Sequence, residues 1–173
     1  MGSYVYLANL TPFPIGISVS STLSSDYWTQ QTTVLDAGLI AGVENPNPFY
    51  CGGNSLIEMN RDVGVSSGDY FYFNITISLN QSTDAAAQFV LQARLYGTAV
   101  GSDICLGAHG PGFQTGWYTD DDTHGGWPIV YNGTSYSLWL CMQDSDPATT
   151  WAGLYYLVCP TDYPAPTSVD STN

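Results

Sequence analysis

One stretch decides the fold, and it reads Tyr70-Phe71-Tyr72-Phe73-Asn74-Ile75-Thr76-Ile77-Ser78-Leu79. Large apolar residues occupy every second position from Phe71 onward, and tyrosines and polar residues fill the positions between them. A period of two is typical of a β-strand that turns one face to a core and the other to solvent. The sequence therefore predicts a strand over residues 70–79 whose solvent face begins with two tyrosines.

The next segment, Ala85–Tyr96, carries two conflicting signals. Its three leading alanines favour a helix that Ser82, Thr83 or Asp84 could cap and that Gly97 would end. From Gln88 onward, however, apolar and polar residues alternate again. We prefer a strand because this alternation is cleaner than any helical stripe. We therefore expect an antiparallel hairpin between residues 70–79 and Gln88–Tyr96.

Several other short segments have the composition of strands and are bounded by glycine, proline, asparagine or aspartate. They are Tyr4–Ala8, Ile15–Ser20, Thr32–Leu35, Ser55–Met59, Ser135–Met142 and Leu154–Cys159. We therefore predict an all-β fold, an antiparallel β-sandwich of about 8–10 strands in a jelly-roll or Ig-like arrangement, with little helix. A single domain is expected over residues 1–160, followed by a tail rich in proline, serine and threonine over residues 161–173.

The charge balance excludes several classes of function. The chain of 173 residues has no lysine, and its two arginines, Arg61 and Arg94, stand against fifteen acidic residues for a net charge of −13. A protein without a basic surface cannot neutralise phosphates, so we expect neither nucleic acid nor an anionic membrane as a partner. The lysine of a P-loop is missing as well.

The four cysteines and the acidic, lysine-free surface favour a secreted protein. Four cysteines, at positions 51, 105, 141 and 159, allow three disulfide pairings and form no Cys-x-x-Cys zinc motif. Asn-x-Ser/Thr motifs begin at Asn9, Asn74, Asn80 and Asn132. The residues Met1–Tyr6 lack the basic and apolar pattern of a signal peptide, so the expectation of secretion depends on the cysteines and the lysine-free surface.

The longest irregular stretch is expected over residues 107–127, and it contains a run of aspartates. Oxygen ligands at alternate positions with a glycine after them can wrap a calcium ion, as in the first part of an EF-hand loop. Tyr131 stands where the closing glutamate of such a loop would be. Together with a second acidic pair, the candidate calcium ligands are Asp120, Asp122, Asp144 and Asp146. The alternative is a solvated loop whose aspartates serve turns.

Aromatic residues surround this loop and favour a carbohydrate site. Sugar rings offer C–H faces to aromatic rings, and their hydroxyls need polar partners. The candidate ligand-binding residues are Trp117, Tyr118, His124, Trp127 and Tyr131. The alternative for each ring is a place in the core. A separate group, Tyr70, Tyr72 and Tyr96 beside Arg94, forms a surface patch if the polar face of the hairpin is exposed.

Catalytic motifs are weak. Ser102, Asp103 and His109 are the residue types of a triad, but no Gly-x-Ser-x-Gly elbow accompanies them. We therefore predict a non-enzymatic, lectin-like carbohydrate-binding protein, with calcium as a candidate cofactor and a glycan or other small polar ligand as partner. One alternative is a structural, storage or self-assembling protein that forms homo-oligomers. Another is a small hydrolase that uses paired carboxylates.

Overall fold

The hairpin predicted from the alternation forms as expected. The computed structural model describes residues 3–37, 54–59, 65–99, 101–119, 123–143 and 152–158. In it, β6 (Tyr70–Leu79) pairs antiparallel with β7 (Gln88–Thr98). The register sets Ile75 opposite Leu91, so the apolar side chains of both strands share one face of the sheet.

Both signals in segment 85–96 have a structural counterpart. The carboxylate of Asp84 accepts a hydrogen bond from the backbone N–H of Ala86 at 3.0 Å and caps a single 3-10 turn, η2 (Ala85–Ala87). β7 follows immediately, which confirms the preferred strand from Gln88 onward. The alternation wins over alanine propensity because it lets Phe89 and Leu91 enter the core.

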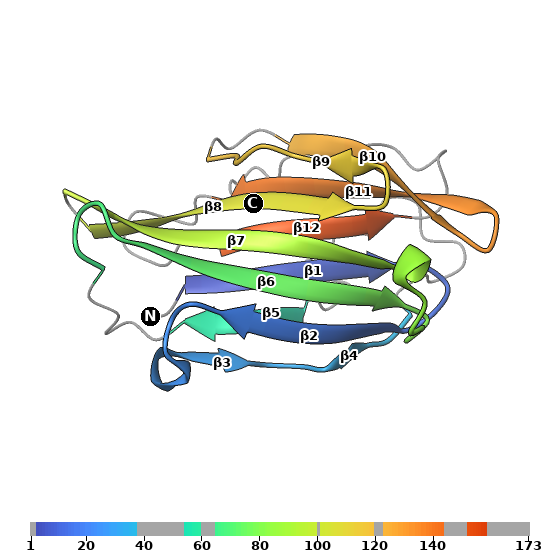
Figure 1. Cartoon of the computed structure of the whole chain (residues 1–173), viewed down its shortest axis with the longest axis horizontal. Coiled ribbons are helices and arrows are strands. Elements are labelled where there is room, and N and C mark those ends of the chain that lie inside the picture. Colours follow the sequence, from blue (N-terminus) through green and yellow to red (C-terminus); the bar gives the residue numbers. More distant parts are fainter. Residues whose placement is uncertain are drawn as a thin grey trace, which may run out of the picture.

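Two six-stranded sheets make up the described part of the molecule (Figure 1). The front sheet has the order β4-β2-β6-β7-β8-β9 and the rear sheet the order β10-β11-β12-β1-β5-β3. Besides β6 and β7, the front sheet contains β2 (Ile15–Ser21), β4 (Val34–Leu35), β8 (Gly101–Gly110) and β9 (Phe113–Gln114). The rear sheet contains β1 (Ser3–Leu10), β3 (Trp28–Gln30), β5 (Asn54–Met59), β10 (Thr123–Tyr131), β11 (Thr134–Gln143) and β12 (Ala152–Val158). All neighbouring strands are antiparallel except β1 and β12, which run parallel.

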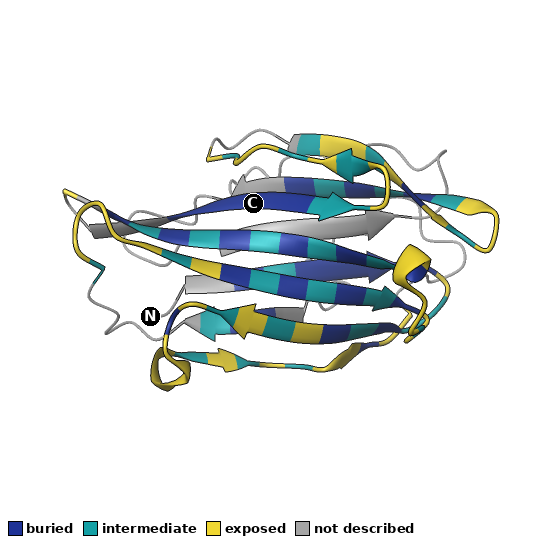
Figure 2. Ribbon diagram, viewed as in Figure 1, coloured by how far each residue is buried: buried dark blue, intermediate teal, exposed yellow. Residues whose placement is uncertain are grey.

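One hydrophobic core takes side chains from both sheets. Val5, Leu7 and Leu138 of the rear sheet belong to the same buried cluster as Phe73 and Ile75 of the front sheet. Buried and partly exposed residues alternate along β6 and β7, as the bands in Figure 2 show. Burial of one such side chain contributes about 1.5–3 kcal/mol to folding. The all-β, mainly antiparallel fold expected from the sequence is therefore present.

The structure corrects two details of that expectation. Twelve strands lie within the described residues instead of about 8–10, and three of them, β3, β4 and β9, have only two or three residues. The stretch 107–127, expected to be irregular, contains the end of β8, all of β9 and the start of β10. Its glycines have weak β-propensity, and β10 tolerates Pro128 because it is an edge strand.

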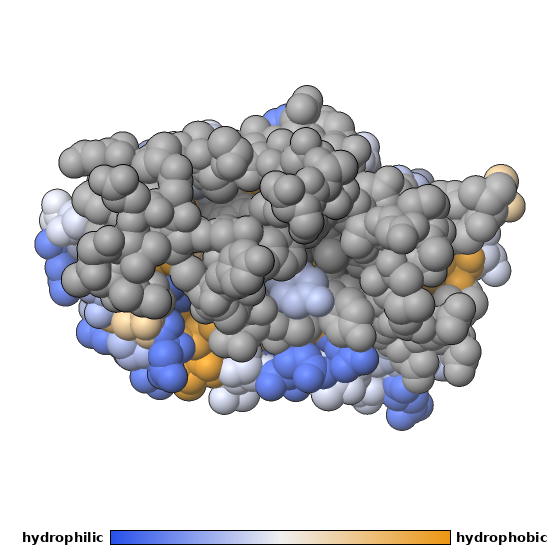
Figure 3. All heavy atoms as spheres, turned by 180° about the vertical axis from the view of Figure 1, so that it is seen from behind, coloured by the Kyte–Doolittle hydropathy of each residue, from blue (hydrophilic) through white to orange (hydrophobic). Residues whose placement is uncertain are grey.

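Helical structure in the described ranges is limited to η1 (Ser25–Tyr27) and η2. No helix there is long and apolar enough to cross a membrane. The expected tail, residues 161–173, and the domain boundary at residue 160 lie outside the described residues. Seen from behind, hydrophilic residues gather along the lower rim of the described surface, with hydrophobic ones between them (Figure 3).

Candidate functional site: an aromatic platform on the front sheet

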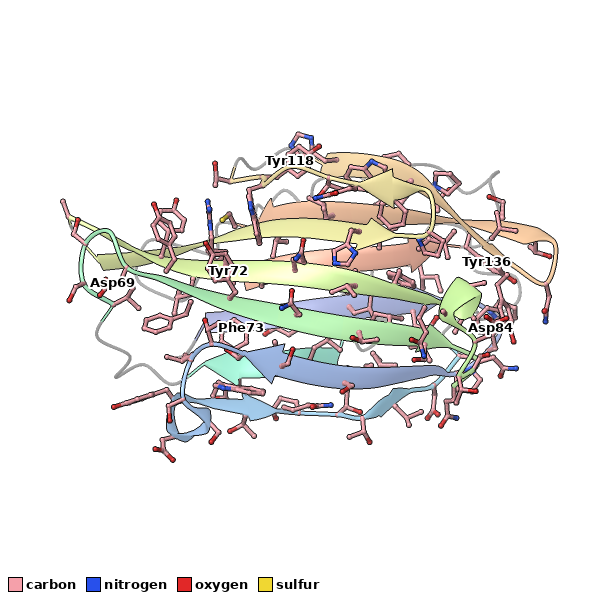
Figure 4. All side chains as sticks on the ribbon, viewed as in Figure 1. Asp69, Tyr72, Phe73, Asp84, Tyr118 and Tyr136 are labelled. Atoms are coloured by element: carbon pink, nitrogen blue, oxygen red, sulfur yellow. The ribbon has the colours of Figure 1, made fainter. Side chains whose placement is uncertain are left out.

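The five ligand-binding residues predicted from the sequence do not form one cluster. Trp117 lies on the outer face of the front sheet beside Tyr72, whereas Tyr118 stacks on His124 at the edge of the two sheets. Figure 4 labels Tyr72 on β6 and Tyr118 near β9 and β10. Trp117 and Tyr118 are neighbours in an extended segment, so their side chains point to opposite faces.

Four aromatic residues and one arginine form an exposed group on the outer face of the front sheet. We call this group the aromatic platform, and it consists of Tyr70, Tyr72, Tyr96, Trp117 and Arg94. Tyr70 stacks on its cross-strand partner Tyr96 with ring centroids 6.2 Å apart, and the rings of Tyr72 and Trp117 are 6.1 Å apart. Tyr70, Tyr72 and Trp117 are 48%, 38% and 36% exposed. They make up half of the exposed large hydrophobic side chains in the described chain, which makes the platform the candidate site.

Arg94 lies among these rings. Its Cζ atom is 4.9 Å from the ring centroid of Tyr70, 5.9 Å from that of Tyr96 and 4.8 Å from that of Trp117. These distances are within the range of cation–π contacts. Nε of Arg94 donates a hydrogen bond of 3.0 Å to Sγ of Cys105, its cross-strand partner on β8. One guanidinium thus links rings that come from three separate segments of the chain.

The environment of Arg94 keeps it charged. Burial opposes the charged guanidinium and lowers its pKa, but hydrogen bonds to Cys105 and Tyr72 and the negative charge that these groups can carry raise it. The net result is a raised pKa, so Arg94 is a permanent cation in neutral solution. Arg61 lies outside the described residues, and Arg94 is the one arginine within them.

Trp117 reaches the platform because β8 has glycine at position 107. The segment after β9 runs along the edge of β8, where Tyr118 and Leu106 exchange backbone hydrogen bonds of 2.9 and 3.1 Å. A Cβ atom on Gly107 would lie 2.9 Å from the carbonyl oxygen of Gly116 and 3.6 Å from Cε3 of Trp117. A side chain here would push the segment outward, so close approach of the backbone requires glycine.

Polar side chains continue the outer face beyond the platform. Nε2 of Gln92 donates a hydrogen bond of 3.1 Å to Oδ1 of its cross-strand partner Asn74. Thr76 and Ser78 follow on the same face of β6, and Ser18 of β2 pairs with Thr76. Amides and hydroxyls thus adjoin the aromatic rings, and together they offer the polar and apolar contacts that a sugar requires.

A second aromatic group closes the edge between β9 and β10. We call it the edge seam, and it consists of Phe113, Tyr118, His124 and Trp127. The rings of Tyr118 and His124 stack with centroids 3.9 Å apart, and Trp127 lies 6.1 Å from Tyr118 and 6.4 Å from Phe113. Two rings come from the front sheet side and two from β10, and Trp127, Tyr118 and Phe113 pack against the core. The core role considered as the alternative for Trp127 matches this packing.

A bulge in β10 lets His124 and Trp127 face the same way. Residues three apart on a regular strand point to opposite faces, yet both of these pair with buried residues of β11. Gly126, with φ of 79°, is the extra residue that restores the phase. A Cβ atom on Gly125 would lie 2.6 Å from the carbonyl oxygen of Leu138, so the bulge also needs glycine there.

Tyr131 belongs to neither group. Its ring contacts Phe13 with centroids 5.1 Å apart at an interplanar angle of 61°. Its hydroxyl accepts a hydrogen bond of 3.3 Å from Nδ2 of Asn80, in the turn that follows β6. Tyr131 therefore packs at the β10–β11 turn, away from Trp117 in the described structure.

The four predicted calcium ligands, Asp120, Asp122, Asp144 and Asp146, lie outside the described residues. Within those residues, no group of three or more histidine, cysteine, aspartate or glutamate side chains is arranged to hold a metal ion. The register of the rear sheet sets Thr123 opposite Cys141. The first residue of β10 therefore lies opposite the end of β11. In the sequence, Asp120 and Asp122 precede β10, and Asp144 and Asp146 follow β11.

The candidate triad is excluded by its spacing along β8. Ser102, Asp103 and His109 all belong to this strand. Asp103 and His109 are six residues apart, and at about 3.3 Å per residue their backbones are separated by about 20 Å. Catalytic partners must come within hydrogen-bonding distance.

Of the cysteines, Cys105 is buried, whereas Cys51, Cys159 and the side chain of Cys141 lie outside the described part.

Sequence patterns account for most of the platform but not for Trp117. Tyr70, Tyr72 and Arg94 occupy polar-face positions of the predicted hairpin, and the alternation alone identifies them. The place of Trp117 depends on the path of the chain past Gly107, for which no local pattern exists. No family model matches the chain, and no curated protein or solved structure matches it significantly.

Proposed function

We propose that this protein is a non-enzymatic, lectin-like carbohydrate-binding module whose ligand lies across the outer face of the front sheet. The observation that carries the proposal is the aromatic platform beside its strip of amide and hydroxyl side chains. Rings such as Trp117 and Tyr72 take the C–H face of a sugar, and Asn74 and Gln92 bind its hydroxyls.

The platform is also organised before a ligand arrives. Cation–π contacts with Arg94 and stacking between Tyr70 and Tyr96 hold the rings in place. Side chains that are already ordered lose little conformational entropy on binding. Same-face positions repeat every second residue along β6, at intervals of about 6.6–6.8 Å, which favours an extended chain of sugars over a single small molecule.

The proposal moves the binding site away from the edge seam. Tyr118, His124 and Trp127 are only partly exposed, and they hold the two sheets together. Their rings are occupied by one another and by the core. Of the five residues expected from the sequence, only Trp117 belongs to the proposed ligand surface.

Calcium is a separate part of the proposal. It depends on Asp120, Asp122, Asp144 and Asp146, whose segments adjoin neighbouring ends of β10 and β11. Carboxylates that lie close together repel one another, and a divalent cation with oxygen ligands relieves that repulsion.

A glycan array probed in calcium and in a chelator is the first test. Binding in both conditions would support the carbohydrate-binding function and remove calcium from the proposal. Binding that disappears with the chelator would support both parts. A protein that is folded but binds no glycan in either condition would contradict the proposal.

A pair of variants locates the binding surface. Trp117→Ala should reduce affinity for any glycan found on the array by about 10- to 100-fold, because tryptophan is a frequent hot-spot residue. Tyr27→Ala is the matched control, since Tyr27 is 42% exposed but lies on η1, outside the platform. An equal loss in both variants would show that the platform is not the binding surface.

A further inference from the structure

We propose that the ligand of the aromatic platform is an acidic glycan, and that Arg94 binds a carboxylate carried by one of its sugars. This inference rests on the carbohydrate-binding function proposed above. It assigns Arg94 a direct contact with ligand in addition to its contacts with the rings.

Arg94 lacks an acidic partner in the described structure. The described contacts of Arg94 are with aromatic rings, with the hydroxyl of Tyr72 and with Cys105, whose Sγ accepts a hydrogen bond from Nε and donates one to the backbone carbonyl of Arg94. Of the five N–H groups of a guanidinium, the bonds to Cys105 and Tyr72 account for two. The others form a planar fork that matches the two oxygens of a carboxylate.

The rings around Arg94 favour such a contact. Tyr70 and Trp117 lie within 4.9 Å of Cζ and displace water from the guanidinium. A charge-assisted hydrogen bond is stronger where water is partly excluded. Because Nε is already held by Cys105, less side-chain entropy is lost when the remaining N–H groups bind an anion.

The net charge of −13 does not prevent this binding. At physiological salt, repulsion between exposed charges is screened beyond about 8 Å, while a direct contact pair is screened much less. The overall charge should lower the association rate, and the local pair at Arg94 should determine which glycan stays bound. The charge pattern therefore predicts selection for a single well-placed carboxylate over a densely anionic polymer.

Matched ligand pairs that differ only in the acid group test the inference. Affinities are measured for 3′-sialyllactose against its methyl ester, galacturonic acid against its methyl ester, and dextran sulfate against dextran. We expect at least one carboxylate ligand to bind about 10- to 100-fold more tightly than its neutral partner, and dextran sulfate to bind no better than dextran. Arg94→Gln should abolish this preference, and because Arg94 also holds the rings in place, it should weaken binding of the neutral partner as well.

The outcomes separate the two proposals. Binding of neutral sugars as tightly as acidic ones, or a preference for dextran sulfate, would overturn the assignment of Arg94 and leave the carbohydrate-binding function standing. Failure to bind any glycan on the array or in the pairs would overturn both. The ligand pairs give this answer with the unmodified protein, so it does not depend on the folding of a variant. Arg94→Lys keeps the charge and loses the fork, and it should lose most of the preference.

Discussion

Arg94 contacts side chains from β6, β8 and the segment after β9, and these contacts would be lost together if the guanidinium were removed. A tyrosine or tryptophan ring without such a contact on a flat sheet is free to turn toward its neighbours or the solvent. The cation holds three rings at once, and Cys105 holds the cation by accepting its Nε–H bond. At this scale the platform depends on one residue that the strand register places between Tyr70 and Trp117.

The raised pKa of Arg94 makes a prediction about pH. A group whose pKa is raised on folding stabilises the folded state below its unfolded pKa, and this contribution is lost as pH rises through the folded pKa. Both values lie in the strongly alkaline range, so the charge is constant at neutral and mildly acidic pH. Affinity for a carboxylate glycan should therefore be flat from about pH 5 to 9 and fall below about pH 4, where the ligand carboxyl is protonated. Calorimetric titrations across this range are the measurement, and a step near pH 6–7 would instead indicate a histidine.

Gly125 gives a second residue-scale prediction. Gly125→Ala places a Cβ atom 2.6 Å from the carbonyl oxygen of Leu138 and from Cα of Trp139, both backbone atoms that cannot move without disturbing β11. We expect a loss of about 2–3 kcal/mol in the free energy of unfolding, measured by denaturant titration. Gly116→Ala is the control, because no atom lies within 4 Å of its added Cβ, and its stability should change by less than about 0.5 kcal/mol. Equal effects would argue against the bulge.

At the edge between β9 and β10, aromatic side chains from the two sheets pack together. β10 and the segment after β9 belong to different sheets, and the rings of Tyr118, His124 and Trp127 interleave between them. A two-layered β structure has an open side wherever two edge strands fail to pair. Here aromatic packing takes the place of backbone hydrogen bonds between the two edge strands. The glycine bulge turns both His124 and Trp127 of β10 toward this packing.

Substitution of two tryptophans tests whether the edge seam stabilises the fold and the platform binds ligand. Trp127→Ala removes a ring from the edge seam and should lower the free energy of unfolding by about 2–4 kcal/mol, with little effect on the affinity of the folded protein. Trp117→Ala removes an exposed ring and should lower it by less than about 1 kcal/mol while reducing affinity. Denaturant titration and glycan binding measured on the same preparations provide both values. If Trp127→Ala reduced affinity and Trp117→Ala reduced stability, the edge seam would be the binding surface and the platform would be structural.

At the scale of the whole molecule, the charge of −13 dominates. With a sequence pI of about 4.1 and no lysine, the protein is strongly anionic at neutral pH, and this charge opposes association between copies. The exposed rings of Tyr70, Tyr72 and Trp117 would otherwise favour association.

The charge predicts how association depends on pH. Light scattering and sedimentation should find a monomer at pH 7 and reversible self-association near pH 4.1, where repulsion vanishes. Tyr72→Ala should leave the monomer at pH 7 unchanged. If the protein instead forms a stable oligomer at pH 7 and Tyr72→Ala dissociates it, the platform is a self-assembly surface and not a ligand site. That result would support the alternative function considered from the sequence.

The sequence by itself determined the strands whose residues alternate without interruption. β6 and β7 were predicted, with the face that each side chain takes, because the period of two is a local property of the chain. The tyrosines and Arg94 on the outer face follow from the same alternation. The absence of lysine is likewise read directly from the composition.

Only the tertiary structure decided which aromatic residues meet. The loop residues predicted to form one site divide between two faces, because Trp117 and Tyr118 lie on an extended edge segment and the bulge after His124 shifts the alternation of β10. β8 and β10 were missed because glycine and proline carry little β signal, and their strand character comes from pairing with distant partners. The alternation along a strand determines which face of the sheet each side chain takes. Pairing between strands distant in the sequence determines which side chains lie beside it, and a binding surface requires several side chains to lie side by side.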